Sequence, residues 1–354
     1  MLKILNEVKR ELSGKINPKA SKMTGKPAVE ITIPSWAKKI KSGDPVALAR
    51  AITLVESSLP SDQEKASQLL SACSPGSGGS MRLGITGPPG VGKSSFIEYM
   101  GNALLARDSL KIAVLAIDPS SPAQGGSILG DKTRMQVLAQ QEGVFIRPSP
   151  SRPGGGGIHD QTLHSIQLCE YAGYDLIVVE TVGIGQSELN IHDITDLTLL
   201  LIPPGGGDEL QGIKRGITEI ADLILVHKND SGLQNLARAT QNHYQQALKL
   251  PGGRGIQVFT VSSLTQKGFD RVWEQILKLA AERKASGEWK KNRTRQRIRW
   301  FHSLIKRQWA AELNRYHAGK PLQAVEKKIG STTGYIGALA QAYYRALKKK
   351  ALKP

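Results

Sequence analysis

The segment formed by residues 87–94 constrains the fold more than any other part of the chain. It reads Gly-Pro-Pro-Gly-Val-Gly-Lys-Ser and fits the pattern G-x-x-x-x-G-K-[ST] at every position. An apolar run, 81–86, precedes it, and a segment of helical character follows from residue 93. Glycines let the backbone wrap around an anion, and N–H groups at a helix N-terminus carry partial positive charge. The segment therefore predicts a phosphate-binding loop between a strand and a helix.

The residues of this loop have distinct expected roles. We expect Lys93 to reach the β- and γ-phosphates of a nucleotide and to act in catalysis. The Ser94 hydroxyl is expected to ligate Mg²⁺, and the backbones of Ser94 and Ser95 to hold the α- and β-phosphates. The predicted nucleotide-binding set in this segment is Gly87, Pro88, Pro89, Gly90, Val91, Gly92, Lys93, Ser94 and Ser95.

Short apolar runs alternate with helical segments through the middle of the chain. Strands are expected at 81–86, 111–117, 144–146, 176–179, 197–202, 223–226 and 256–261. Helices are expected at 94–107, 160–172, 208–221, 232–249 and 268–284. This alternation predicts an α/β fold of the P-loop NTPase type, with a mainly parallel central sheet. Functional loops should lie at the carboxyl ends of the strands.

Helical extensions are expected on both sides of this sheet. We divide the chain into a basic, loosely ordered lead-in (1–39), an N-terminal helical region (40–80), the P-loop domain (81–284) and a basic C-terminal helical region (285–354) for dimerisation or partner contact. Within the second region, Asp44 is placed to cap a helix that Pro45 opens.

Positive charge is concentrated at the two ends of the chain. The formal net charge is +18, with +7 in residues 1–50, +8 in 281–315 and +7 in 316–354, which leaves −4 for 51–280. The basic ends fit either solvated helical faces or docking onto an acidic protein surface or nucleic acid. Aromatic residues make up only 5% of the chain, which argues against a groove that stacks sugars or bases.

Three carboxylates are candidates for holding Mg²⁺, which prefers oxygen ligands. Asp118 and Glu180 each follow an apolar strand, and Asp131 lies in a glycine-rich stretch that begins at Gly125. Many switch GTPases have D-x-x-G at the position of Glu180-Thr181-Val182-Gly183. We predict Ser94, Asp118, Asp131 and Glu180 as metal ligands, and Lys93, Asp118 and Glu180 as the catalytic set.

The sequence after the sixth strand, His227-Lys228-Asn229-Asp230, resembles the guanine reader N-K-x-D. An aspartate at the position of Asp230 accepts hydrogen bonds from the guanine N1 and N2 edge, which adenine cannot donate, and the stem of Lys228 would cover the ring. His227 replaces the asparagine but can still donate one hydrogen bond. After the seventh strand, Ser262, Ser263 and Leu264 are expected to present a backbone N–H to the base. GTP is therefore favoured over ATP.

Three features favour the cytoplasm as the compartment. Cys73 and Cys169 are far apart and lack metal-ligand spacing, so we expect buried thiols in a reducing environment. No apolar run is long enough for a membrane helix, and residues 1–15 lack the apolar core of a secretory signal.

Six motifs together carry a family resemblance, which covers residues 40–280. They are Gly87–Ser95, Asp118–Ser121, Gly125–Met135, Phe145–Ser149, Glu180–Ser187 and Gly207–Lys214. In this combination the chain resembles the MeaB/ArgK/MMAA family of GTPases. It differs from the family at His227 and at Ser263, where alanine is common, and in its strongly basic ends.

The resemblance implies a homodimeric GTPase that uses GTP and Mg²⁺. Such a protein gates adenosylcobalamin loading into an acyl-CoA mutase, typically methylmalonyl-CoA mutase, and protects that enzyme. The segment 205–219, with Asp208 and Lys214, resembles the switch that couples the nucleotide state to the mutase. An older description as an arginine/ornithine transport kinase fits less well, because nothing in the chain resembles a transporter partner.

Two other function classes stay open beside this one. A GTPase that inserts a metal such as nickel usually shows a histidine-rich tract or a Cys/His cluster, and the sequence shows neither. A nucleic-acid-associated GTPase could use the basic ends, although recognisable RNA-binding motifs are missing from them. The residue that positions the attacking water is not identified; Gln186 is one candidate.

Overall fold

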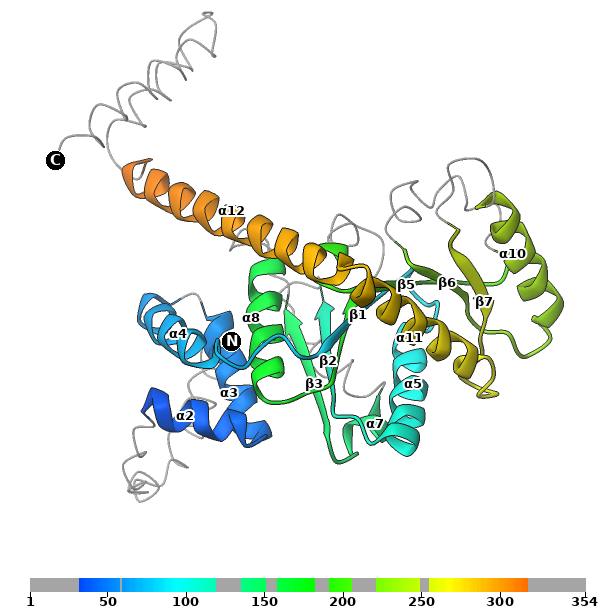
Figure 1. Cartoon of the computed structure of the whole chain (residues 1–354), viewed down its shortest axis with the longest axis horizontal. Coiled ribbons are helices and arrows are strands. Elements are labelled where there is room, and N and C mark those ends of the chain that lie inside the picture. The colour runs from blue at the N-terminus through cyan, green and yellow to red at the C-terminus, as the bar shows by residue number, and fades with distance from the viewer. Residues whose placement is uncertain are drawn as a thin grey trace, which may run out of the picture.

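The strands predicted from the apolar runs assemble into one parallel sheet. The computed structural model describes residues 32–57, 59–118, 135–150, 158–181, 191–205, 221–248 and 255–317. The strands are β1 (Met81–Thr86), β2 (Ile112–Asp118), β3 (Val144–Pro150), β4 (Leu176–Thr181), β5 (Leu197–Ile202), β6 (Leu223–Val226) and β7 (Gln257–Thr260). They pair in the order β3-β2-β4-β1-β5-β6-β7, and every neighbouring pair is parallel (Figure 1). The predicted α/β class is confirmed.

Helices cover this sheet, and further helices precede β1 and follow β7 in the chain. They are α2 (Ile33–Lys41), α3 (Pro45–Glu56), α4 (Pro60–Cys73), α5 (Lys93–Asp108), α7 (Gln136–Ala139), α8 (Ile158–Tyr171), α10 (Gln234–Ala247), α11 (Phe269–Ala285) and α12 (Glu288–His317), with a short 3₁₀ helix, η2 (Ile191–Asp193). All but the last residue of the helix expected over 208–221 lies outside the described residues.

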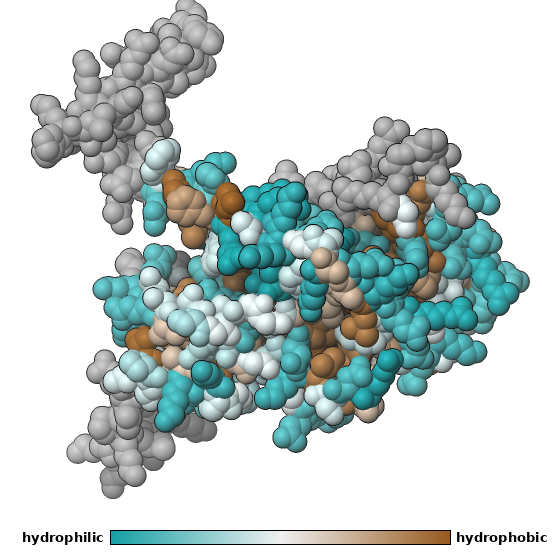
Figure 2. Space-filling view, in the orientation of Figure 1, coloured by the Kyte–Doolittle hydropathy of each residue, from teal (hydrophilic) through white to brown (hydrophobic). Residues whose placement is uncertain are grey.

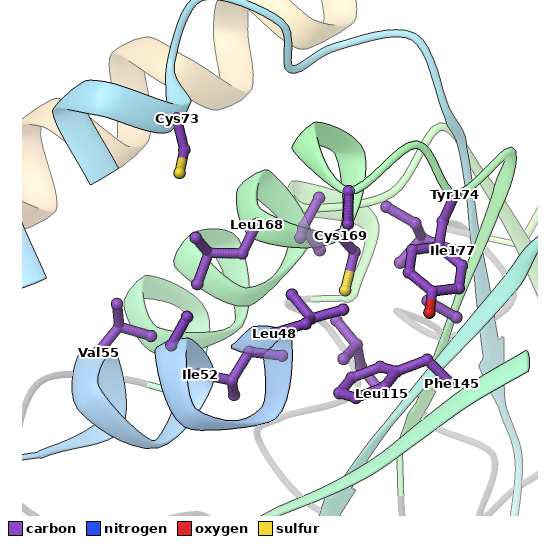
Figure 3. Packing of buried hydrophobic residues seen from close by; sticks show 14 of the residues in the cluster. Leu48, Ile52, Val55, Cys73, Leu115, Phe145, Leu168, Cys169, Tyr174 and Ile177 are labelled. Atoms are coloured by element: carbon purple, nitrogen blue, oxygen red, sulfur yellow. The ribbon is translucent and has the colours of Figure 1, made fainter. Parts of the chain in front are cut away.

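Alternate side chains of the strands pack into hydrophobic cores on the two faces of the sheet. On β2, Ala113, Leu115 and Ile117 pack with α8 and the N-terminal helices, whereas Ile112 and Val114 pack with α5 and α11. A parallel sheet must be covered on both faces, because its crossover helices lie on both sides. Figure 3 shows the first of these cores, between α3, α8 and the sheet.

Helix α3 begins as its sequence predicts. The Asp44 carboxylate accepts hydrogen bonds from the backbone N–H groups of Val46 (2.8 Å) and Ala47 (3.0 Å), which satisfies two of the unpaired donors at the helix start. From there Leu48 and Ile52, one helical turn apart, are buried in the core beside α8 (Figure 3). The cap and the apolar stripe thus fix this helix on the domain.

Helix α2 was not predicted, and the expected boundary at residue 39 lies inside it. Thr32 precedes the helix and Pro34 lies in its first turn, where proline is tolerated. The Trp36 indole donates a hydrogen bond to the Ala47 carbonyl (3.0 Å), and Ile40 is fully buried. The lysines around them pointed to a loosely packed segment, but this short apolar stripe is enough for docking.

Both cysteines are free thiols in the first core, as expected. Burial raises the pKa of Cys73 to about 11, and burial with the nearby Glu170 raises the pKa of Cys169 further. Both thiols therefore stay protonated and behave as small apolar side chains.

Helix α12 is fastened to the domain at its root by a buried arginine. The Arg293 guanidinium donates to both carboxylate oxygens of Asp196 (2.7 and 2.6 Å) and to the Gly78 carbonyl (2.6 Å). Glu170 of α8 lies 3.6 Å away. The arginine therefore joins α12, the start of β5 and the segment before β1 in one ionic network.

Further along, Trp300 of α12 packs edge-on against His164 of α8, with ring centroids 5.1 Å apart. Burial, with a contribution from Arg307, lowers the pKa of His164 to about 4, so this contact holds a neutral ring at neutral pH. Beyond it the helix projects past the domain (Figure 1). Figure 2 shows both hydrophilic and hydrophobic residues along this helix, on which Ile298 and Phe301 are exposed. Among the helices that the structure describes, none combines the length and apolar character needed to cross a membrane.

The ionic network at the root of α12 gives a stability prediction. Arg293→Ala leaves the Asp196 carboxylate buried without its guanidinium partner, which should lower the free energy of unfolding by about 3–5 kcal/mol. Urea unfolding followed by circular dichroism measures this change. Arg297→Ala, on the exposed side of the same helix, is the matched control and should stay within about 0.5 kcal/mol of wild type. Equal losses in the two variants would contradict the assignment.

Candidate functional site

The phosphate-binding segment lies at the carboxyl end of β1, between β4 and β5. Gly87 has φ 148°, and a Cβ there would collide with the Leu201 carbonyl oxygen of β5. Gly92 has φ 97°, and a Cβ there would lie 2.6 Å from the His227 ring. Because both positions combine a positive φ with a close neighbour, the turn from β1 into α5 requires glycine at each.

Lys93 is the first residue of α5 and is 6% exposed. Its ammonium group donates hydrogen bonds to the carbonyls of Gly87 (2.8 Å) and Pro88 (3.1 Å). The cation is therefore held inside the loop, where an anion bound at the helix N-terminus would meet it.

The fold brings Ser94, in the first turn of α5, beside Glu180 of β4. The Ser94 hydroxyl donates to the Glu180 carboxylate at 3.0 Å, and both side chains are buried. Glu180 is placed by β4, and the next residue, Thr181, donates to Thr86 of β1 at 3.0 Å. The strand order thus sets the carboxylate beside the first turn of α5.

The donor set at this point fits Mg²⁺. A serine hydroxyl and a carboxylate are hard oxygen ligands, and Mg²⁺ is usually held by one or two carboxylates together with water and phosphate oxygens. Asp118 ends β2, the strand that pairs with β4 on the side away from β1, so its backbone lies at the same edge of the sheet. The Asp118 side chain and Asp131 lie outside the described part of the chain.

The predicted base-reading loop follows β6 and reaches back to the phosphate loop. Lys228 has a positive φ of 63°, and its ammonium group donates to the Gly90 carbonyl at 2.8 Å. Asp230 is 8% exposed and accepts hydrogen bonds from the hydroxyls of Ser231 (3.0 Å) and Ser262. These contacts orient the carboxylate expected to read guanine.

The loop after β7 lies against this reader. A backbone pair between Ser262 and Lys267 closes it, with N···O distances of 3.0 and 3.1 Å. The Ser262 hydroxyl is buried against Asp230 and also accepts from the Thr265 N–H at 3.0 Å, whereas Leu264 is 75% exposed. The structure therefore brings Ser262 to Asp230 and leaves Leu264 facing solvent.

His227 donates the one hydrogen bond that its sequence allowed and makes a second contact that sequence reasoning missed. Its backbone N–H donates to Ile202 of β5 (2.9 Å) and its ring is 3% exposed. The ring Nδ1 lies 2.7 Å from the Val91 carbonyl oxygen, and Nε2 lies 2.7 Å from the Ser263 hydroxyl. A carbonyl oxygen can only accept, so Nδ1 carries the proton in this contact. The ring thus touches both the phosphate loop and the loop after β7.

A signal for this contact was present in the sequence. His227 and Ser263 both depart from the family pattern. In the structure these two residues are hydrogen-bonded partners. Two departures that lie after neighbouring strands of one sheet predict such a contact, because the carboxyl ends of the strands bring their loops together.

Some expected functional residues cannot be placed. Gln186, Asp208 and Lys214 lie outside the described residues, as does most of the expected switch segment 205–219. Gly205, where that segment begins, donates its N–H to the Thr240 hydroxyl of α10 at 2.9 Å. The first residue of the expected switch segment is therefore held by α10.

Comparison with known proteins agrees with this geometry. The family described as methylmalonyl Co-A mutase-associated GTPase MeaB matches residues 48–317. The GTPase ArgK of Escherichia coli (strain K12) is 43% identical over 276 residues, which cover 77% of this chain and 83% of that protein. The mitochondrial methylmalonic aciduria type A homolog of Mus musculus is 39% identical over 323 residues, which cover 87% of this chain and 78% of that protein.

A solved structure supports the same assignment. The crystal structure of an LAO/AO transport system kinase aligns with a TM-score of 0.70 at 32% identity, covering 91% of this chain and 99% of that one. The family match covers most of the chain, and the resemblance stated from the motifs is confirmed. This chain therefore belongs to the MeaB family of methylmalonyl-CoA mutase-associated GTPases.

Proposed function

We propose that this GTPase binds GTP and GDP with Mg²⁺ at the carboxyl edge of its sheet, and that it gates adenosylcobalamin loading into an acyl-CoA mutase of the methylmalonyl-CoA mutase type and protects that enzyme. The observation that carries the nucleotide site is the convergence of three loops. The base-reading loop contacts the phosphate loop through Lys228 and Gly90, and the loop after β7 through Asp230 and Ser262. One nucleotide can therefore meet all three.

Several residues of the chain would have separate roles in GTP hydrolysis. Lys93 and the N–H groups at the start of α5 would bind and orient the phosphates, because both supply positive charge to them. Ser94 and Glu180, with Asp118 and Asp131, would hold Mg²⁺. When bound, that ion would neutralise charge developing on the phosphate oxygens.

The base would be read by polar groups at the outer end of the site. Asp230 would accept the N1 and N2 protons of guanine, and the stem of Lys228 would lie over the ring. A backbone N–H among Ser262, Ser263 and Leu264 would donate to the base. The buried hydrogen bonds of Asp230 support a fixed carboxylate, which is what selective reading requires.

The mutase partner is the part of the proposal that rests on the family. We propose that the isolated protein turns over slowly, and that the mutase raises the rate by completing the site. We also propose a homodimer in the cytoplasm. Helix α12 supports a role in protein contact, because Phe301 and Trp309 are large exposed side chains on an arm that projects past the domain.

Removal of the loop cation tests the phosphate site. Lys93→Ala should reduce GTP hydrolysis by at least about a hundredfold, because the charge on the β- and γ-phosphates loses its nearest protein cation. Phosphate release measures the rate, and the melting temperature checks the fold. Lys278→Ala, at an exposed position of α11, serves as the control and should keep the wild-type rate. Undiminished hydrolysis by a folded Lys93→Ala protein would remove this assignment.

Exchange of the base-reading carboxylate tests guanine selectivity. Asp230→Asn replaces one acceptor by an amide donor, which should weaken GTP binding by roughly a hundredfold. The same amide can donate to the 2-oxo group of xanthine, so xanthosine triphosphate should bind the variant better than GTP does. Isothermal titration with both nucleotides measures this. A variant that still prefers GTP would show that another residue reads the base.

The proposed mutase partner is tested by adding it to the GTPase and measuring hydrolysis. GTP hydrolysis by the full chain should rise at least about tenfold when a methylmalonyl-CoA mutase is present, and adenosylcobalamin uptake by the cofactor-free mutase should require hydrolysable GTP. Phosphate release and the cobalamin absorbance spectrum report the two steps. Lys93→Ala is the control that should block both. Rapid hydrolysis that no mutase alters would contradict the partner while leaving the nucleotide site intact.

A further inference from the structure

We propose that His227 is a positioning residue whose two ring nitrogens carry separate tasks: Nδ1 sets how firmly any nucleotide is held, and Nε2 sets how strongly guanine is preferred over adenine. The inference rests on the proposed nucleotide site and concerns regulation of that same site. It is carried by contacts to two different loops, Val91 on one side and Ser263 on the other.

The first task follows from the contact at Nδ1. Val91 lies in the middle of the phosphate loop, and its carbonyl accepts from Nδ1 at 2.7 Å. The neighbouring Gly92 presents its bare backbone to the same ring, since a Cβ there would lie 2.6 Å from it. The ring therefore braces the stretch of loop that leads into Lys93. GDP and ADP carry the same phosphates, so loss of this brace should weaken both nucleotides equally.

The second task follows from the contact at Nε2. The Ser263 hydroxyl lies 2.7 Å from Nε2, and Ser263 is adjacent to Ser262, which holds the Asp230 carboxylate. The contact therefore fixes the loop expected to supply a backbone N–H to the base. Its loss should loosen the guanine contacts and leave an adenine nucleotide, which does not use them, unaffected.

The surroundings of the ring favour its neutral form, which offers one donor and one acceptor. The charged groups acting on it are Lys228 and Asp230, both on its own loop. The phosphate loop contributes a carbonyl, the loop after β7 a hydroxyl, and α5 the ring of Phe96, whose centroid is 6.2 Å away. Burial is the main cause that lowers the pKa of His227. A neutral ring with its proton on Nδ1 has Nε2 available to accept from Ser263.

Amide substitutions separate the two nitrogens. Asparagine places its amide at the δ position and can donate to Val91, but it does not reach Ser263. Glutamine places its amide at the ε position and can accept from Ser263, but it leaves Val91 without its donor. His227→Phe keeps the shape of the ring and removes both contacts. Ser263→Ala removes the Nε2 contact from the other side.

The affinities for GDP and ADP, measured by competition with a fluorescent guanine nucleotide in Mg²⁺, are the readout. His227→Gln should weaken both nucleotides by the same factor, about tenfold, as expected for loss of one buried hydrogen bond. His227→Asn and Ser263→Ala should weaken GDP about tenfold and leave ADP unchanged. In the double variant His227→Asn/Ser263→Ala the losses should not add, because both changes remove one contact.

Thermal unfolding of each variant checks that the fold is kept. If His227→Phe does not fold, the Asn, Gln and Ser263→Ala variants still decide the question. Variants that all weaken GDP and ADP equally, or losses that add in the double variant, would overturn the inference and leave His227 with a merely structural role. If wild-type protein binds neither nucleotide, the proposed function itself fails, which is a separate outcome.

Discussion

The close approach of β5 to the phosphate loop is the constraint on which the rest of the site depends. At Gly87 the chain passes so near the Leu201 carbonyl that no side chain fits, and only a glycine can take that turn. The path of the loop is therefore set by the order of β1 and β5 in the sheet, before any ligand contact is considered. The position of Lys93 and the direction of α5 both follow from it, since the helix starts where the turn ends.

The same strand links the start of α12 to the edge of the sheet that carries the phosphate loop. Asp196, just before β5, receives the buried Arg293 of α12, and Leu201, near the end of β5, borders the phosphate loop. One six-residue strand, buried along its whole length, thus spans from the root of the projecting helix to the nucleotide edge. A force on α12 would be transmitted to the sheet through the ion pair of Arg293 and Asp196. Such an arrangement is a contiguous physical connection between α12 and the edge of the sheet that carries the phosphate loop.

The parts of the fold that are encoded locally could be predicted from the sequence. The loop at 87–94, the strands and the Asp44 cap each depend on residues close together in the chain, so pattern and residue type sufficed. Helix α2 and the role of His227 could not be predicted in this way. Trp36 depends on a carbonyl in the following helix, and His227 on an oxygen 136 positions away in the sequence. A residue's local pattern does not reveal a contact of that separation.

The exchange of asparagine for histidine in the base reader is best understood together with its neighbours. A side chain at this position must serve the Val91 carbonyl, and an asparagine amide would end there. The imidazole extends further and presents a second polar atom in a buried place, where an unsatisfied acceptor would cost about 1–3 kcal/mol. Ser263 supplies the hydroxyl that satisfies it, and an alanine there could not. The histidine is therefore tolerable in this buried place because the serine satisfies its second ring nitrogen.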